Sequence, residues 1–224
     1  MITCPDCSAA ATQAVRALLK YHMDSLPVYP QKIIQEYPRA SMLSFADLAA
    51  ITGTDREELL RTAHPSNEAA ATFVFNQPDG PYYLFAFNRE QPIDRIRFAL
   101  SVQVGNVMLG HVGFRPEDVR LKEAFCFARH FCWPRPLIRL MQEYDIPLQE
   151  SVLAMIAGNY GSFIRDLQTE ARPASVPADL NRQVKEMLRP QLLQLLSTGL
   201  IPSSPVPDEP MLDLSTYMEG YVDE

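Results

Sequence analysis

Hydrophobic and polar positions follow a helical period over the N-terminal part of the chain. Four helices are predicted there, at residues 9–23, 31–37, 45–51 and 55–63. Pro27 and Pro30 separate the first two, because proline disfavours helical backbone in the residue before it. Ser44 and Thr54 open the last two, each followed three positions later by an acidic residue that suits a helix N-terminus.

The pattern changes near residue 71. Segments 71–76 and 82–88 are rich in aromatic and branched residues, which are typical of β-strands. The turn-forming stretch Gln77-Pro-Asp-Gly80 lies between them, so we expect an antiparallel hairpin. A longer amphipathic helix at residues 92–111 follows directly.

The rest of the chain is predicted to be helical. One helix begins at Pro116 and runs to Phe131, since proline fits the first turn of a helix. Further helices are expected at 136–144, 148–157, 160–171 and 178–198. Pro190 is expected to kink the last helix and Gly199 to end it. The expected fold class is therefore α+β: mostly helical, with a small antiparallel sheet followed by C-terminal helices.

Composition is that of a folded protein, with 47% hydrophobic and 21% charged residues. No run approaches the roughly 18 apolar residues that a membrane span requires. The first residues also lack the basic and apolar regions of a signal peptide. We expect a cytoplasmic protein that does not contact a membrane.

The net charge of −7 is concentrated at the C-terminus. The acidic residues there, with no Lys or Arg between them, are Asp208, Glu209, Asp213, Glu219, Asp223 and Glu224. The rest is nearly neutral, which argues against a phosphate-binding surface and against nucleic acid as a direct partner. We divide the chain into a domain at 1–145, a helical extension at 146–201 packed on it, and an acidic tail at 202–224.

The tail also carries apolar residues at helical spacing. Met211, Leu214, Met218 and Tyr221 follow the pattern i, i+3, i+7 and i+10, so the segment can form a short amphipathic helix. It would dock either on the protein's own surface or on a partner. Docking on the protein itself is favoured, because a tethered segment has an effective concentration in the millimolar range.

Four cysteines occur, and we expect all of them to be reduced. Cys126 and Cys132 should be buried thiols on nearly opposite faces of their helix. Cys4 and Cys7 have the spacing of half a zinc knuckle or of a redox dithiol. No second Cys/His pair lies at knuckle distance and no strand precedes them, so a partly exposed, reduced pair is the expectation.

The central helix at 92–111 carries the most informative pattern. Val102 and Asn106 stand one turn apart with Gln103 beside them, the geometry in which H-E-x-x-H zincins place two metal-binding histidines and a glutamate base. Valine offers no lone pair, the asparagine amide oxygen is a weak ligand, and glutamine has no useful basicity.

The surrounding sequence resembles the ImmA/IrrE metallopeptidases. The stretch Arg97-Phe-Ala-Leu-Ser-Val-Gln-Val-Gly-Asn106-x-x-Leu109-x-His111 is similar to the family's R-F-T-L-A-H-E-L-G-H-x-x-L-x-H. Downstream, the segment from Glu123-Ala-x-x-Phe-Ala128 to Pro134 is similar to E-A-N-x-F-A-x-x-L-L-M-P, whose glutamate is the third zinc ligand. Matches at Asn88 and at Leu26-Pro-Val28 extend the resemblance over roughly residues 10–145. It implies a zincin-like domain whose zinc site is degenerate.

Glu123 is the one zinc-ligand position that keeps a ligand side chain, and one carboxylate does not hold zinc. A shifted metal site would have to recruit His111, His130, Cys4 or Cys7. On a helical wheel, however, His111 points about 140° away from Asn106 and lies on the core stripe. We expect Glu123 to be hydrogen-bonded to Asn106 or Gln103, with no catalytic residue and no cofactor.

The resemblance implies three functional alternatives. The first is a catalytically inactive homologue that binds a protein or peptide, such as a helix-turn-helix repressor in transcriptional regulation; an extended peptide would add as a strand in the old groove between the hairpin and the central helix. The second is a metal-dependent hydrolase with a rearranged metal site. The third is a structural subunit whose groove is filled by its own tail.

Overall fold

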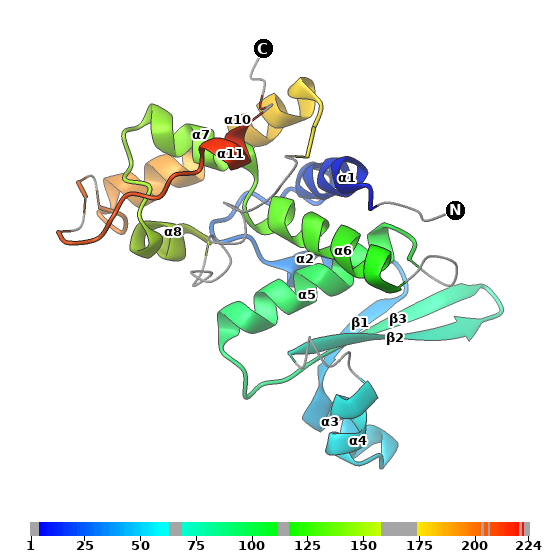
Figure 1. Cartoon of the computed structure of the whole chain (residues 1–224). Helices are drawn as coiled ribbons and strands as arrows, with labels where there is room; N and C mark the ends of the chain where they lie inside the picture. Colours follow the sequence, from blue (N-terminus) through cyan, green and yellow to red (C-terminus); the bar gives the residue numbers. More distant parts are fainter. Residues whose placement is uncertain are drawn as a thin grey trace.

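The computed structural model describes residues 5–62, 69–111, 117–157, 174–202, 204–205, 207–219 and 221. The N-terminal elements are α1 (Cys7–Lys20), α2 (Pro30–Glu36), β1 (Ala40–Ser44), α3 (Phe45–Thr52), α4 (Arg56–Thr62), β2 (Ala70–Gln77) and β3 (Gly80–Phe87). They are followed by α5 (Ile93–Met108), α6 (Glu117–Cys132), α7 (Arg135–Glu143), α8 (Glu150–Ala157), α10 (Ala178–Ser197) and α11 (Ser215–Met218). The α+β fold class is confirmed (Figure 1).

The predicted helices and the hairpin are present with ends shifted by a few residues. Ser44 caps α3 as predicted: its hydroxyl accepts a hydrogen bond from the Asp47 backbone N–H at 3.1 Å. Gly199, with φ of 68°, follows the end of α10, while Pro190 lies inside that helix. The helix expected at 160–171 lies outside the described residues.

The sheet differs from the expectation of a purely antiparallel one. Its strand order is β1-β3-β2, and β2 pairs antiparallel with β3 as the hairpin predicted. The extra strand β1 pairs parallel with β3, with Met42 opposite Phe85. The stretch Ala40–Ser44 was missed because it is short and serine-containing, with little of the branched or aromatic content that marks strands.

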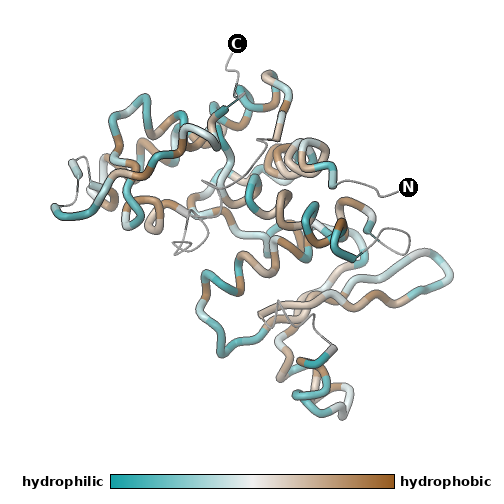
Figure 2. The backbone as a smooth tube through the Cα atoms, in the orientation of Figure 1, coloured by the Kyte–Doolittle hydropathy of each residue, from teal (hydrophilic) through white to brown (hydrophobic). Residues whose placement is uncertain are grey.

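The sheet separates two layers of helices (Figure 1). On one face, Phe85 of β3 joins the main hydrophobic core, which includes residues of α1, α5, α6 and α7. On the other face, Leu84 and Ala86 pack with Phe45 and Leu48 of α3 in a smaller cluster. Hydrophobic positions recur along α1, α5 and α6 where these helices meet (Figure 2).

The helices α5 and α6 pack closely at Gly105. A Cβ atom at this position would lie 2.9 Å from Phe127 Cδ1 and 3.0 Å from Phe127 Cγ, closer than real Cβ contacts allow. The glycine therefore lets α6 approach the middle of α5. The expected adjacency of the helices that carry Val102 and Glu123 is confirmed.

The C-terminal part packs on the N-terminal part. The helix α10 contacts α1 and α7, and Val184 and Leu188 of α10 belong to the main core. In the part of the chain that the structure describes, no helix is both long enough and apolar enough to cross a membrane.

The tail docks on the protein itself, but away from the hairpin (Figure 1). Leu214 and Tyr217 are buried in the main core, and the Leu212 backbone N–H donates to the Leu148 carbonyl at 2.7 Å. Glu209 accepts hydrogen bonds from the Ser151 backbone N–H and hydroxyl at 2.8 and 2.6 Å. The described tail therefore lies against α7 and α8, and the expectation that it fills the groove beside the hairpin is wrong. Its helix is also shorter than the predicted spacing suggested.

Candidate functional site

Val102 and Gln103, two positions of the motif resemblance, lie on the faces of α5 that meet α6 and β2. Val102 is 1% exposed and packs with Ala124 and Ala128 of α6 in a small apolar cluster. Gln103 points toward the sheet, where its side-chain amide donates to the Ala70 carbonyl at 3.4 Å. Val102 therefore serves packing against α6, and Gln103 attaches α5 to β2.

His111 is placed differently from the helical-wheel expectation. The helix α5 ends at Met108, and Gly110 adopts a φ of 64°, so the backbone changes direction before His111. A helical wheel therefore does not give the direction of the His111 side chain. The His111 backbone N–H donates to the Asn106 carbonyl at 3.1 Å. As a result, His111 Nδ1 lies 3.1 Å from Asn106 Oδ1, and the expected 140° separation is wrong.

Glu123 is buried and has partners for both carboxylate oxygens. Its Oε2 lies 2.8 Å from His111 Nε2, and both side chains are 3% exposed. Its Oε1 accepts a hydrogen bond from the Asp6 backbone N–H at 2.9 Å. His111 thus lies between Asn106 and Glu123. The expected direct bond from Glu123 to Asn106 or Gln103 is corrected to an indirect link to Asn106 through His111.

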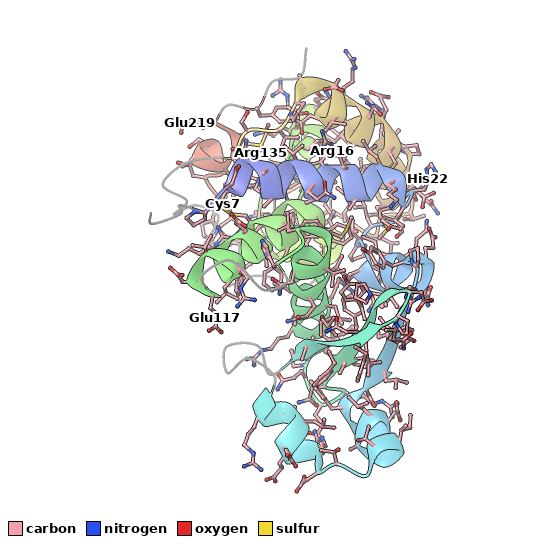
Figure 3. The ribbon with its side chains drawn as sticks, turned by 90° about the vertical axis from the view of Figure 1, so that its right-hand side faces the viewer. Cys7, Arg16, His22, Glu117, Arg135 and Glu219 are labelled. Atoms are coloured by element: carbon pink, nitrogen blue, oxygen red, sulfur yellow. A yellow bond between two sulfur atoms is a disulfide. The ribbon has the colours of Figure 1, made fainter. Side chains whose placement is uncertain are left out.

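The N-terminal segment covers this carboxylate and is fixed by a disulfide. Cys7, the first residue of α1, is bonded to Cys126 of α6 over a Cα–Cα distance of 5.5 Å, which corrects the expectation of reduced thiols (Figure 3). Cys132 is a buried thiol outside the disulfide, as expected, and its Sγ lies 3.3 Å from Ser101 Oγ. Cys4 lies outside the described residues. The pairing was not recognisable in the sequence because the partners are 119 residues apart and belong to different Cys pairs.

Asp6 was also missed as a site residue. It contributes its backbone to Glu123, and its side chain caps α1 by accepting from the Ala9 N–H at 2.9 Å. An N-terminal capping residue before a helix is visible in the sequence, but its tertiary contact with Glu123 is not. Asp6 therefore links the start of α1 to the buried His111–Glu123 pair.

A cleft of about 670 Å³ opens beside this network. Asp6, Gln13 and Arg16 line it from the segment around α1, and Met108 and Leu109 line it from the end of α5. The cleft thus lies on the α1 side of the degenerate site, whereas the sequence pointed to the hairpin side. Its lining combines polar and apolar side chains.

His130 lies two turns beyond Glu123 on α6 and belongs to a different environment. Its Nδ1 lies 2.9 Å from the Cys126 carbonyl, and its ring packs against Tyr217 of the tail with centroids 5.7 Å apart. Burial, the main cause, lowers the pKa of His130 to about 3, and the charges of Arg135 and Arg129 act in the same direction. The imidazole is therefore neutral at ordinary pH.

The described residues bring together two of the candidate ligands, His111 and Glu123, and keep His130 apart. Over the ranges the structure describes, no group of three or more His, Cys, Asp or Glu side chains is arranged to hold a metal ion. No protein-family model, curated protein or solved structure matches the chain. The functional argument therefore starts from the geometry of this site and from the motif resemblance.

Proposed function

We propose that this chain is a catalytically inactive relative of the ImmA/IrrE metallopeptidases that acts by binding a protein or peptide. The observation that carries the proposal is the engagement of Glu123: one oxygen contacts His111 and the other accepts from the Asp6 backbone. A zinc ion bound there would have to displace both contacts and the covering N-terminal segment.

The chemistry of the neighbouring positions supports the same reading. A hydrolytic zinc site needs three protein ligands, an open coordination position and a base for the attacking water. Val102 supplies no lone pair, and the Gln103 amide is a hydrogen-bond donor to Ala70. Each position thus has a role in holding α5 against α6 and β2 that needs no metal.

The surface that we propose for binding is the outer half of β2. This strand lies at the edge of the sheet, where a peptide can add by main-chain hydrogen bonds. Val74 and Phe75 are 40% and 49% exposed, and the hairpin projects beyond the helices there (Figure 1). A partner that adds an extended apolar segment would bury these side chains.

The proposed partner class comes from the resemblance. In the ImmA/IrrE family the peptidase commonly acts on or regulates a helix-turn-helix repressor. We therefore propose a role in transcriptional regulation in the cytoplasm. An inactive homologue would bind such a repressor without cutting it. The protein itself would need no direct contact with nucleic acid.

The test combines the purified full chain with the helix-turn-helix repressor encoded nearest to its gene. We expect a complex by size-exclusion chromatography and calorimetry, with the repressor intact after incubation with zinc. Val74→Lys should weaken the complex, because a charged side chain on an edge strand opposes strand addition. Ile51→Lys, at a 70% exposed apolar position on α3, is the matched control and should not weaken it.

Repressor cleavage that is abolished by Glu123→Ala and by a chelator would overturn the proposal. It would support the alternative, a metal-dependent hydrolase with a rearranged site, which the 2.8 Å approach of His111 to Glu123 favours. Equal binding by the Val74→Lys and Ile51→Lys variants would instead show that β2 is the wrong surface.

A further inference from the structure

The corner between α6 and α7 contains a buried polar cluster that the proposed function does not use. His130 and Arg135 pack against the ring of Tyr217 from the tail, and Trp133 lies between them in the sequence. The Tyr217 hydroxyl donates to the Trp133 carbonyl, and Arg135 Cζ lies 5.0 Å from the centre of the Tyr217 ring. The exposed fractions of His130, Trp133 and Arg135 are 1%, 1% and 2%, respectively.

Four nitrogen atoms of this cluster have no hydrogen-bond partner within the described part of the chain. They are Arg135 Nε, Arg135 Nη2, Trp133 Nε1 and His130 Nε2. The remaining Arg135 nitrogen, Nη1, makes only a long contact of 3.4 Å with the Glu219 carbonyl. Among the ion pairs between described residues, none includes Arg135.

A buried guanidinium without a counter-charge is expensive, and the stacking on Tyr217 returns only part of that cost. Buried polar groups in folded proteins are nearly always paired, so a set of orphaned nitrogen atoms around one charge points to a missing partner. An oxyanion is the partner that matches a guanidinium, because its oxygens accept two parallel N–H bonds.

The fourth nitrogen adds a second requirement. His130 Nδ1 forms a hydrogen bond with the Cys126 carbonyl oxygen. Because a carbonyl oxygen can only accept, Nδ1 carries the proton and donates it. In a neutral imidazole Nε2 is then an acceptor without a donor. The cluster thus offers three N–H donors and one acceptor, a pattern that an oxyanion with one hydroxyl group satisfies.

We propose that Arg135, Trp133 and His130 form a binding site for a small hydroxylated oxyanion such as hydrogen phosphate. Arg135 supplies the charge and two donors, Trp133 a third donor, and His130 accepts from the hydroxyl group. The ligand approaches from the tail side, where Glu219 is exposed. The site lies apart from Glu123 and from the β2 edge, so an experiment can disprove it without affecting the proposed function.

The test is calorimetric titration of the full chain with inorganic phosphate at constant ionic strength and neutral pH. We expect saturable binding of one phosphate per chain, and weaker binding of sulfate, which carries no hydroxyl at this pH. Arg135→Met should abolish the heat. Arg139→Met, an exposed position on the same helix, is the matched control and should bind like the wild type.

Stability gives a second readout that does not depend on the ligand. In oxyanion-free buffer Arg135→Met should melt at or above the wild-type temperature, because it removes an unpaired buried charge. Trp133→Phe keeps the ring and loses one donor, so it should weaken phosphate binding several-fold while the protein stays folded. Absent binding by the wild type, or binding that survives in Arg135→Met, overturns the site. A lower melting temperature of Arg135→Met in oxyanion-free buffer also overturns it, since Arg135 would then already be satisfied by the protein.

Discussion

At the scale of single residues, Glu123 is a buried carboxylate with protein partners for both of its oxygens. Its carboxylate joins three distant segments: the N-terminal segment through the Asp6 backbone, the turn after α5 through His111, and α6 itself. The Arg120 side chain adds a hydrogen bond to the His111 carbonyl at 3.1 Å. These contacts give the carboxylate a structural role that is sufficient to explain its burial.

His130 makes a prediction about pH. The folded state holds the pKa of His130 at about 3, against 6.5 for the free side chain, so the unfolded chain binds the proton first. Stability from this residue is complete above pH 6.5 and is lost as the pH falls toward 3, by roughly 1.4 kcal/mol per pH unit.

Urea denaturation of the wild type and of His130→Asn at pH 7, 6 and 5 measures this effect. The asparagine side-chain N–H can replace Nδ1 on the Cys126 carbonyl, but it does not titrate. The difference in unfolding free energy between the two proteins should therefore shrink as the pH falls. A difference that is independent of pH would show that folding does not lower the pKa of His130.

Residue-level sequence reasoning succeeded where a side chain stays on a regular element. The adjacency of the helices that carry Val102 and Glu123 was predicted, and in the structure Val102 packs with Ala124 and Ala128 of α6. It failed for His111, because the backbone turn at Gly110 changes the direction of the following residue. Gly110 was the available signal in the sequence that the helix ends before His111, because glycine is common just after the end of a helix.

At the scale of elements, the contact of α5 with α6 depends on Gly105. Gly105→Ala would gain helix propensity, about 1 kcal/mol. It would also place a Cβ 2.9 Å from Phe127 Cδ1, and the strain of such overpacking costs typically 1–3 kcal/mol. We expect net destabilisation in thermal or urea unfolding. Combining it with Phe127→Leu, which removes the ring, should cost less than the sum of the two single changes. If the two changes in unfolding free energy add up fully, Gly105 and Phe127 are not in contact.

The disulfide connects α1 to α6, and its contribution should depend on the redox state. Closing a loop of 119 residues constrains the unfolded chain, and loops of this size correspond to about 4–5 kcal/mol. Under oxidising conditions Cys7→Ser should lower the unfolding free energy toward that of the reduced wild type. Cys132→Ala is the matched control, which should keep its sensitivity to dithiothreitol. If dithiothreitol does not change the unfolding free energy of the wild type, the Cys7–Cys126 bond has no stabilising role.

The elements that the sequence predicted best are those with strong local signals. The hairpin follows from its turn, and the Ser44 cap fixes the start of α3. The strand β1 was missed because its pairing is parallel and long-range, and its five residues carry no strong alternation. The disulfide partners were missed for the same physical reason: tertiary proximity over a long separation leaves no local pattern.

At the scale of the whole molecule, the C-terminal tail completes the core. Tyr217 is fully buried, and its hydroxyl donates to the Trp133 carbonyl at the α6–α7 corner. The local apolar spacing in the tail predicted docking on the protein, but it contained no information about which surface receives it. The receiving surface is formed by residues from α6, α7 and α8.

Tyr217 therefore predicts a graded effect on global stability. Tyr217→Phe should cost about 1 kcal/mol, because it removes one hydrogen bond and keeps the ring. Tyr217→Ala should cost about 3–5 kcal/mol by leaving a cavity, and it should raise the binding of a hydrophobic dye. Chemical denaturation with dye fluorescence measures both. Equal stability of the alanine variant and the wild type would mean that the tail is not part of the folded core.

At the same scale, we propose that the buried Glu123–His111 pair is structural and binds no zinc. Metal analysis of the full chain, purified from zinc-replete medium without chelator, tests it most directly. We predict substoichiometric zinc that is the same in the wild type and in Glu123→Ala. Stoichiometric zinc in the wild type, lost in Glu123→Ala and in His111→Leu, would contradict the claim and establish a rearranged metal site.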